Sequence, residues 1–79
     1  MPVPIRVPEL GTDQCRFSLW HVMLGEHVHE GDRIVEILIP GACVDLPAPV
    51  SGVLSARLVA GNDPLQIGQI LGQIEPDPD

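Results

Sequence analysis

Two cysteines are the most reactive side chains in this sequence of 79 residues, and a thiol pair would be a simple route to redox chemistry. Cys15 and Cys43 are too few for a disulfide framework. Neither has a neighbouring lysine or an adjacent histidine that would activate it as a thiolate. We therefore expect two separate, reduced thiols that fill small, semi-buried sites. A small thiol redox or transfer protein that uses both cysteines is the alternative.

His27 and His29 are the second group that could do chemistry, because imidazole nitrogen is a preferred ligand of Zn²⁺. Both flank the apolar Val28 and would point away from the core if Val28 points into it. Three acids around them would complete a loose metal site: Glu26, Glu30 and Asp32. Histidines two apart in an acidic turn are more typical of a solvated face, so we predict no metal site, with a loose site at this turn as the alternative.

The sequence has no spacing typical of a catalytic centre. It contains no Ser/His/Asp or Cys/His constellation and no glycine loop of the kind that holds phosphates, and its acids are scattered rather than paired. It also contains no lysine, since all four basic side chains are arginines. We predict a chain that is not an enzyme and has no catalytic residues.

Charge and composition exclude several classes of partner. The net charge is -7, without any cluster of basic residues, so nucleic acid and anionic membrane surfaces are poor partners. No apolar run approaches the length of a membrane span, and residues 1–6 lack the layout of a signal peptide. We therefore expect a cytoplasmic protein.

An internal repeat organises the chain. Shifting the sequence by 37 residues superposes seven pairs of similar residues: Val7 and Val44, Phe17 and Leu54, Val22 and Val59, Val28 and Leu65, Gly31 and Gly68, Ile34 and Leu71, and Ile37 and Ile74. This spacing indicates two copies of one β-unit. In each unit, Gly25 or Asn62 precedes the repeated glycine by six positions, as expected for a turn that needs positive φ.

The strands and turns together predict an all-β fold. Aliphatic runs at 34–39, 44–46, 53–59 and 70–74 read as strands, and Pro40 followed by Gly41 has the order of a type II turn between two of them. We expect a flattened barrel or β-sandwich of two antiparallel sheets with three or four strands each and an internal pseudo-twofold repeat. The folded domain should cover residues 1–75, followed by an acidic, proline-rich tail at 76–79. Ten residues should face inward: Phe17, Val22, Val28, Ile34, Ile37, Leu54, Val59, Leu65, Leu71 and Ile74.

Several segments resemble the lipoyl and biotinyl carrier domains, closest to the lipoyl domains of dihydrolipoamide acyltransferases. Residues 5–11 are similar to the opening strand and turn of that family, and Trp20-His21-Val22 through Gly31-Asp32 to its second strand and following turn. Residues 42–52, with Pro47-Ala48-Pro49, and residues 68–75 resemble the strands that follow. The resemblance covers residues 5–75 and implies a barrel-sandwich hybrid.

The departures from the family pattern fall at one end of the domain. Lipoyl domains carry Asp-Lys-Ala at a hairpin tip and biotinyl domains usually Met-Lys-Met, where this chain has Pro40, Gly41 and Ala42. The resemblance thus implies a degenerate attachment turn, with no cofactor and no cofactor-binding residue. The loop from Gly11 to Arg16 is also shorter than in typical lipoyl domains, where it helps a partner enzyme recognise the domain.

We therefore predict a non-catalytic binding or assembly module that has lost its cofactor-bearing lysine. By resemblance it is related to the acyltransferase component of 2-oxoacid dehydrogenase complexes. Its partner would be a protein, such as a component of a multienzyme complex, and the domain would be a monomer in isolation. Besides the thiol protein, a third possibility is a structural piece of a larger transport or carboxylase assembly, although Met1 favours a chain that starts here.

Overall fold

Eight antiparallel strands contain the regular structure of the protein. The computed structural model describes residues 1–78, and this part of the chain forms no helix, so none that could span a membrane. The strands are β1 (Val3–Arg6), β2 (Cys15–Trp20), β3 (His27–Val28), β4 (Arg33–Ile39), β5 (Ala42–Pro47), β6 (Gly52–Arg57), β7 (Pro64–Leu65) and β8 (Ile70–Pro76). Short strands broken by proline and glycine follow from a sequence rich in β-branched residues and turn formers.

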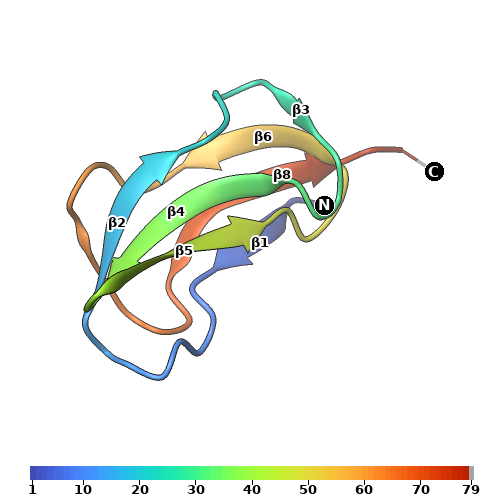
Figure 1. Cartoon of the computed structure of the whole chain (residues 1–79). Coiled ribbons are helices and arrows are strands. Elements are labelled where there is room, and N and C mark those ends of the chain that lie inside the picture. The colour runs from blue at the N-terminus through green and yellow to red at the C-terminus, as the bar shows by residue number, and fades with distance from the viewer. Residues whose placement is uncertain (79) are drawn as a thin grey trace.

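The strands form two four-stranded sheets that face each other. One sheet has the order β1-β8-β6-β3 and the other β5-β4-β2-β7 (Figure 1). The molecule is elongated, with extents of 39 × 20 × 17 Å. The predicted all-β sandwich of two antiparallel sheets is confirmed.

The repeat of 37 residues relates one sheet to the other. Adding 37 to the bounds of β2, β3 and β4 gives the bounds of β6, β7 and β8. Even the irregularities repeat, because β2 shifts register between Phe17 and Leu19, and β6 does so between Leu54 and Ala56. The predicted pseudo-twofold repeat is therefore present in the backbone as well as in the sequence.

One of the seven superposed pairs is wrong. Val7 exchanges hydrogen bonds with 68–69, and the residue that makes the equivalent bonds with 31–32 is Ala48 rather than Val44. The offset between β1 and β5 is thus 41 residues, not 37, because the loop between Val7 and β2 is four residues longer than the one between Ala48 and β6. Aliphatic residues are common enough in this chain for Val44 to match Val7 at the wrong offset.

The repeated turns have the backbone geometry that their residues predicted. Gly25 and Asn62 have φ of 87° and 68°, in the left-handed region. In both turns the acid one position later closes a ring with the backbone: Met23 N donates to Glu26 Oε1 at 3.0 Å, and Ala60 N to Asp63 Oδ2 at 2.9 Å. The same side-chain device therefore fixes the turn in each half.

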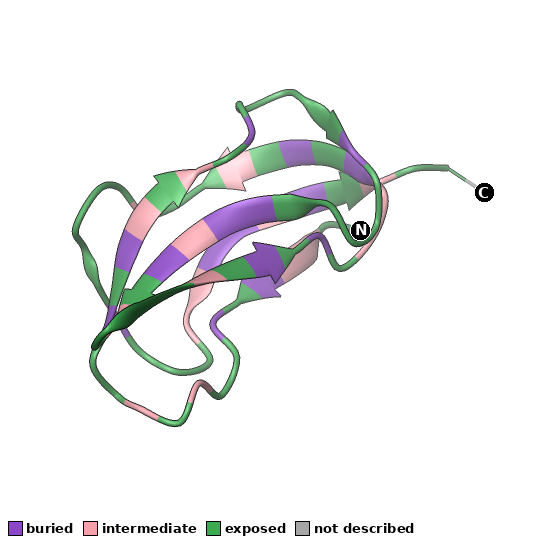
Figure 2. Ribbon diagram, viewed as in Figure 1, coloured by how far each residue is buried: buried purple, intermediate pink, exposed green. Residues whose placement is uncertain are grey.

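The core lies between the two sheets (Figure 2). Nine of the ten residues predicted to face inward are buried, and the tenth, Val59, is partly buried against the same core. The prediction missed six buried hydrophobic residues: Ile5, Val7, Cys15, Val35, Leu46 and Ala48. Val35 breaks the alternation along β4 because the register with β5 shifts between Arg33 and Val35, so that Ile34 and Val35 are both fully buried.

The folded unit reaches slightly beyond the predicted boundary at residue 75. Strand β8 ends at Pro76, and Asp77 N donates to Ser51 O at 3.0 Å. Pro78 is exposed, and Asp79, the end of the predicted tail, lies outside the described residues.

Truncating the core on either side of the repeat should destabilise the protein. Leu65 and Val28 are equivalent in the two halves, and only 3% and 2% of their surfaces are exposed. Leu65→Ala should lower the free energy of unfolding by about 2 to 4 kcal/mol, with a smaller loss for Val28→Ala because that truncation removes fewer carbon atoms. Urea denaturation would measure both. The control is Leu58→Ala at an exposed site, expected to change stability by less than about 0.5 kcal/mol.

Candidate functional site

The tip of the β4–β5 hairpin is the place where the sequence predicted a degenerate attachment turn. Ile39 and Ala42 pair across the two strands, so the loop consists of Pro40 and Gly41 alone. Gly41 has φ of 78°, and the ring of Pro40 fixes the preceding φ near about -65°, as in a type II turn. The predicted turn is confirmed. Both residues of the loop are exposed, as is Ala42.

The hairpin tip has a free position but no reactive group. It lies at one end of the long axis, and both termini lie at the other (Figure 1). Gly41 has no side chain, and Pro40 and Ala42 carry no nucleophile or amine. An amide-linked cofactor needs a primary amine on the side chain that carries it, and these three residues provide none.

A shallow groove lies beside the tip. It has a volume of about 470 Å³ and is lined by residues 13–16, by the end of β4 and the first loop residue at 38–40, and by β7 at 64–65. Arg16 Nη1 donates to Asn62 O at 3.1 Å, which holds the guanidinium beside β7. The groove is thus lined both by the shortened loop that precedes β2 and by the hairpin tip. A partner that contacts the tip would therefore also meet this surface.

The two cysteines do not form a pair. Cys15 is the first residue of β2 rather than part of a loop, and it is buried, whereas Cys43 on β5 is exposed. Strand β4 lies between them, since Arg16 pairs with Leu38 and Leu38 with Cys43. Two strand spacings put the cysteine backbones about 10 Å apart, beyond the roughly 7 Å that a disulfide can bridge. This separation argues against the alternative in which Cys15 and Cys43 form a redox pair.

The turn around His27 and His29 does not gather its acids into a metal site. Glu26 accepts a hydrogen bond from Met23 N, and Asp32 accepts one from His29 N at 2.8 Å, so both carboxylates fix turns. His27 Nε2 instead lies 3.0 Å from both carboxylate oxygens of Asp77. Among residues 1–78, the one group of three potential metal ligands that lie together is elsewhere.

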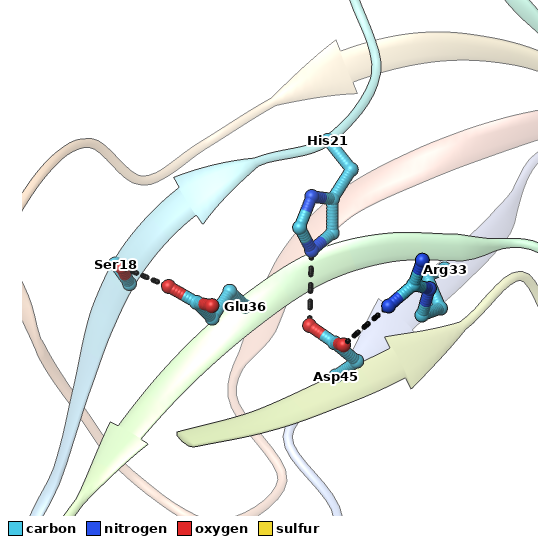
Figure 3. Close-up of polar contacts among 5 residues, drawn as sticks. All are labelled: Ser18, His21, Arg33, Glu36 and Asp45. Carbon is cyan, nitrogen blue, oxygen red and sulfur yellow. Dashed lines mark hydrogen bonds and ion pairs between the residues drawn. The ribbon is translucent and has the colours of Figure 1, made fainter.

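That group comprises His21, Glu36 and Asp45, on the outer face of the β5-β4-β2-β7 sheet (Figure 3). His21 Nε2 lies 2.9 Å from Asp45 Oδ1, and Arg33 Nη1 lies 3.4 Å from Asp45 Oδ2. The hydrogen bond from His21 lowers the pKa of the Asp45 carboxyl below its ordinary value, with smaller contributions from the charges of His21 and Arg33. Asp45 is therefore a carboxylate at neutral pH.

Sequence analysis missed this cluster, although one signal for it was available. A hairpin whose loop is 40–41 pairs residues whose numbers sum to 81, and Glu36 and Asp45 are such a pair. Both would then lie on one face of the sheet. Nothing in the sequence spacing points to His21, which joins them from the chain beyond β2.

Comparisons with known proteins agree on one family. The family model described as "Biotin-requiring enzyme" matches residues 3–74. The lipoamide acyltransferase component of the branched-chain alpha-keto acid dehydrogenase complex of Pseudomonas aeruginosa is 31% identical over 89% of this chain. The dihydrolipoyllysine-residue succinyltransferase component of the 2-oxoglutarate dehydrogenase complex of Bacillus subtilis is 33% identical over 89% of it. This chain spans only 16% and 17% of the lengths of these relatives.

A solved structure matches the whole fold. It is the lipoyl domain of the 2-oxoglutarate dehydrogenase complex from Azotobacter vinelandii, with a TM-score of 0.71 over 96% of this chain and 98% of that domain. The two sequences are 21% identical, so this likeness establishes the fold alone.

The two thiols should differ sharply in reactivity. Cys43 is exposed and should be alkylated rapidly by iodoacetamide, whereas the buried Cys15 should react only when the protein unfolds. Mass spectrometry of the native and urea-treated protein would count the modified cysteines, with Cys43→Ser to assign them. Formation of an intramolecular disulfide under mild oxidation, without loss of the fold, would contradict the placement of the two strands.

Proposed function

This chain belongs to the biotin/lipoyl domain family, and on that premise we propose that it is a non-catalytic binding or assembly module without the family's swinging arm. In this proposal Gly41 occupies the position of the lost cofactor-bearing lysine. The observation that carries it is the exposed Pro40–Gly41 turn, at the tip of an otherwise complete scaffold.

The contrast between the scaffold and its tip supports this proposal. The domain has a buried core, and the turns and backbone pairing recur in its two halves. Each of these features depends on specific residues in both halves. The sequence nevertheless contains no lysine that could take over at another exposed site. Decay of the whole domain would be expected to damage the core as readily as the tip. Retention of the fold with a changed tip is more consistent with a domain that still binds something.

We propose a protein partner, namely a component of a 2-oxoacid dehydrogenase complex in the cytoplasm. Support comes from the relatives, which are components of such complexes by name. The contact surface would be the hairpin tip together with the groove beside it, because both lie at the end of the domain away from the termini. Binding there would need no cofactor and no catalytic group in this chain. The domain itself would be a monomer in isolation.

Capture from a lysate of the source organism would test the partner. The immobilised protein should enrich subunits of a 2-oxoacid dehydrogenase complex, identified by mass spectrometry. Arg16→Glu reverses a charge in the groove and should reduce capture, whereas the matched reversal Arg57→Glu, on the other sheet, should not. Recovery of none of these subunits, or equal capture by both variants, would argue against the proposed partner or contact surface respectively.

Restoring the lysine would test descent from a working carrier. The native chain should have its unmodified mass, because it offers no lysine for lipoate or biotin. Gly41→Lys alone should be modified weakly by a lipoate or biotin ligase, since φ of 78° costs a side-chain-bearing residue about 1 to 2 kcal/mol and Pro40 restricts the turn. Adding Pro40→Asp recreates Asp-Lys-Ala and releases that restriction, so the double variant should be modified clearly.

A lysine elsewhere is the control for this experiment. Gly61 is an exposed turn glycine with open space around the position of a Cβ. Gly61→Lys should remain unmodified, because a ligase that recognises the hairpin tip would not reach it. A double variant that folds but is not modified at high ligase concentration would show that the tip has diverged in geometry. A lipoyl or biotinyl mass increment on the native chain would overturn the proposed loss itself.

A further inference from the structure

We propose that His21, Glu36 and Asp45 together bind one divalent transition-metal ion, of the Zn²⁺ class, on the outer face of the β5-β4-β2-β7 sheet. One ligand atom from each residue lies within 4.8 Å of the other two, close enough to surround a single ion. Figure 3 shows His21, from the chain just beyond β2, pointing at Asp45 on β5, with Glu36 on β4 beside them and its carboxylate turned toward Ser18.

The backbone holds the three residues in place before any ion binds. Glu36 and Asp45 are directly opposite each other in the β4–β5 ladder. His21 follows Trp20, whose Nε1 donates to Val59 O at 3.2 Å, and His21 N itself donates to Ile34 O at 2.9 Å. Ligands on paired strands and an anchored loop lose little conformational freedom when they bind.

Each carboxylate has an outer partner on one oxygen. Ser18 Oγ donates to Glu36 Oε2 at 2.6 Å, and Arg33 Nη1 reaches Asp45 Oδ2 at 3.4 Å. The ion would take Oε1 of Glu36 and Oδ1 of Asp45. Outer partners of this kind orient ligands at metal sites and raise their affinity. The arrangement therefore resembles a ligand set with its supporting shell, rather than three isolated surface groups.

The chemistry of the ligands selects the ion. One imidazole nitrogen and two carboxylate oxygens suit Zn²⁺ or a similar transition metal better than Mg²⁺ or Ca²⁺, which prefer oxygen alone. His21 must offer the lone pair of Nε2, so any proton on that nitrogen leaves to solvent as the ion takes its place between His21 and Asp45. Water would complete the coordination.

Electrostatics also favour a cation here. Like charges directly opposite across two strands repel each other, and the chain as a whole carries a charge of -7. Arg33 offsets part of this repulsion from the far side of Asp45. Its side chain is 76% exposed, so solvent screens its charge and it opposes a bound cation only weakly.

The internal repeat shows that the fold does not require this cluster. The positions equivalent to His21, Glu36 and Asp45 in the other sheet are Leu58, Gln73 and Pro4, from offsets of 37, 37 and 41 residues. Leu58 N donates to Leu71 O just as His21 N donates to Ile34 O, so the backbone is the same in both places. Three potential ligands are thus gathered on one sheet only.

Calorimetric titration of the whole chain with ZnCl₂ would test the site. We expect one equivalent of Zn²⁺ to bind the native protein, and His21→Ala and Glu36→Gln each to weaken binding at least about 10-fold. The controls are the double variant His27→Ala with His29→Ala, which removes the other histidines, and Cys43→Ser, which removes the exposed thiol. Both should bind as the native protein does, and circular dichroism would confirm that every variant is folded.

Thermal unfolding with and without Zn²⁺ gives an independent measurement. An ion that bridges three segments of the folded sheet should raise the midpoint of the native protein and of both controls, but not that of His21→Ala. The inference would be overturned if millimolar Zn²⁺ neither bound nor stabilised the native protein. It would equally be overturned if His21→Ala and Glu36→Gln bound like the native chain, or if binding depended on His27 and His29 or on Cys43.

Discussion

Burial of one aliphatic face of each sheet against the other is the interaction on which this structure depends. A chain of 79 residues with a single Phe and a single Trp must obtain most of its stability from Val, Ile and Leu, each contributing about 1.5 to 3 kcal/mol when fully buried. The 37-residue repeat places the aliphatic residues with the same spacing in both halves, and each half contributes strands to both sheets. The tip of a hairpin at the end of such a sandwich makes almost no contribution to the core. It is therefore free to change.

The sequence predicted the parts of the fold that depend on local geometry. Positive φ at Gly25 and Asn62, the type II turn at Pro40–Gly41, and nine of ten inward residues follow from turn chemistry and alternation. The errors arise where the two halves differ in length or where a strand shifts register. The extra four residues before β2 caused Val7 to be matched with the wrong residue. The register shift at the start of β4 buries Val35, which a strict alternation of buried and exposed residues does not predict.

The candidate sites were predictable to different degrees. The hairpin tip could be located because its turn residues and its resemblance to a carrier family coincide at Gly41. The cluster of His21, Glu36 and Asp45 could not, because its third member arrives through tertiary structure. Hairpin pairing alone brings Glu36 beside Asp45, whereas His21 reaches them only because the chain beyond β2 is tied back to Ile34. The acids around His27 and His29 show that residues close in sequence need not form a site. Glu26 and Asp32 instead accept hydrogen bonds from backbone N–H groups of their own turns.

The pseudo-twofold repeat separates what the fold needs from what this chain has added. Buried positions and turn-closing acids occur in both halves, so packing and turn geometry account for them. Features present in only one half need another explanation. The polar cluster on the outer face of one sheet has Leu58, Gln73 and Pro4 as its counterparts on the other, although the backbone hydrogen bonds are the same. Since the scaffold stands without charges at one set of positions, the fold does not require the charges at the other set.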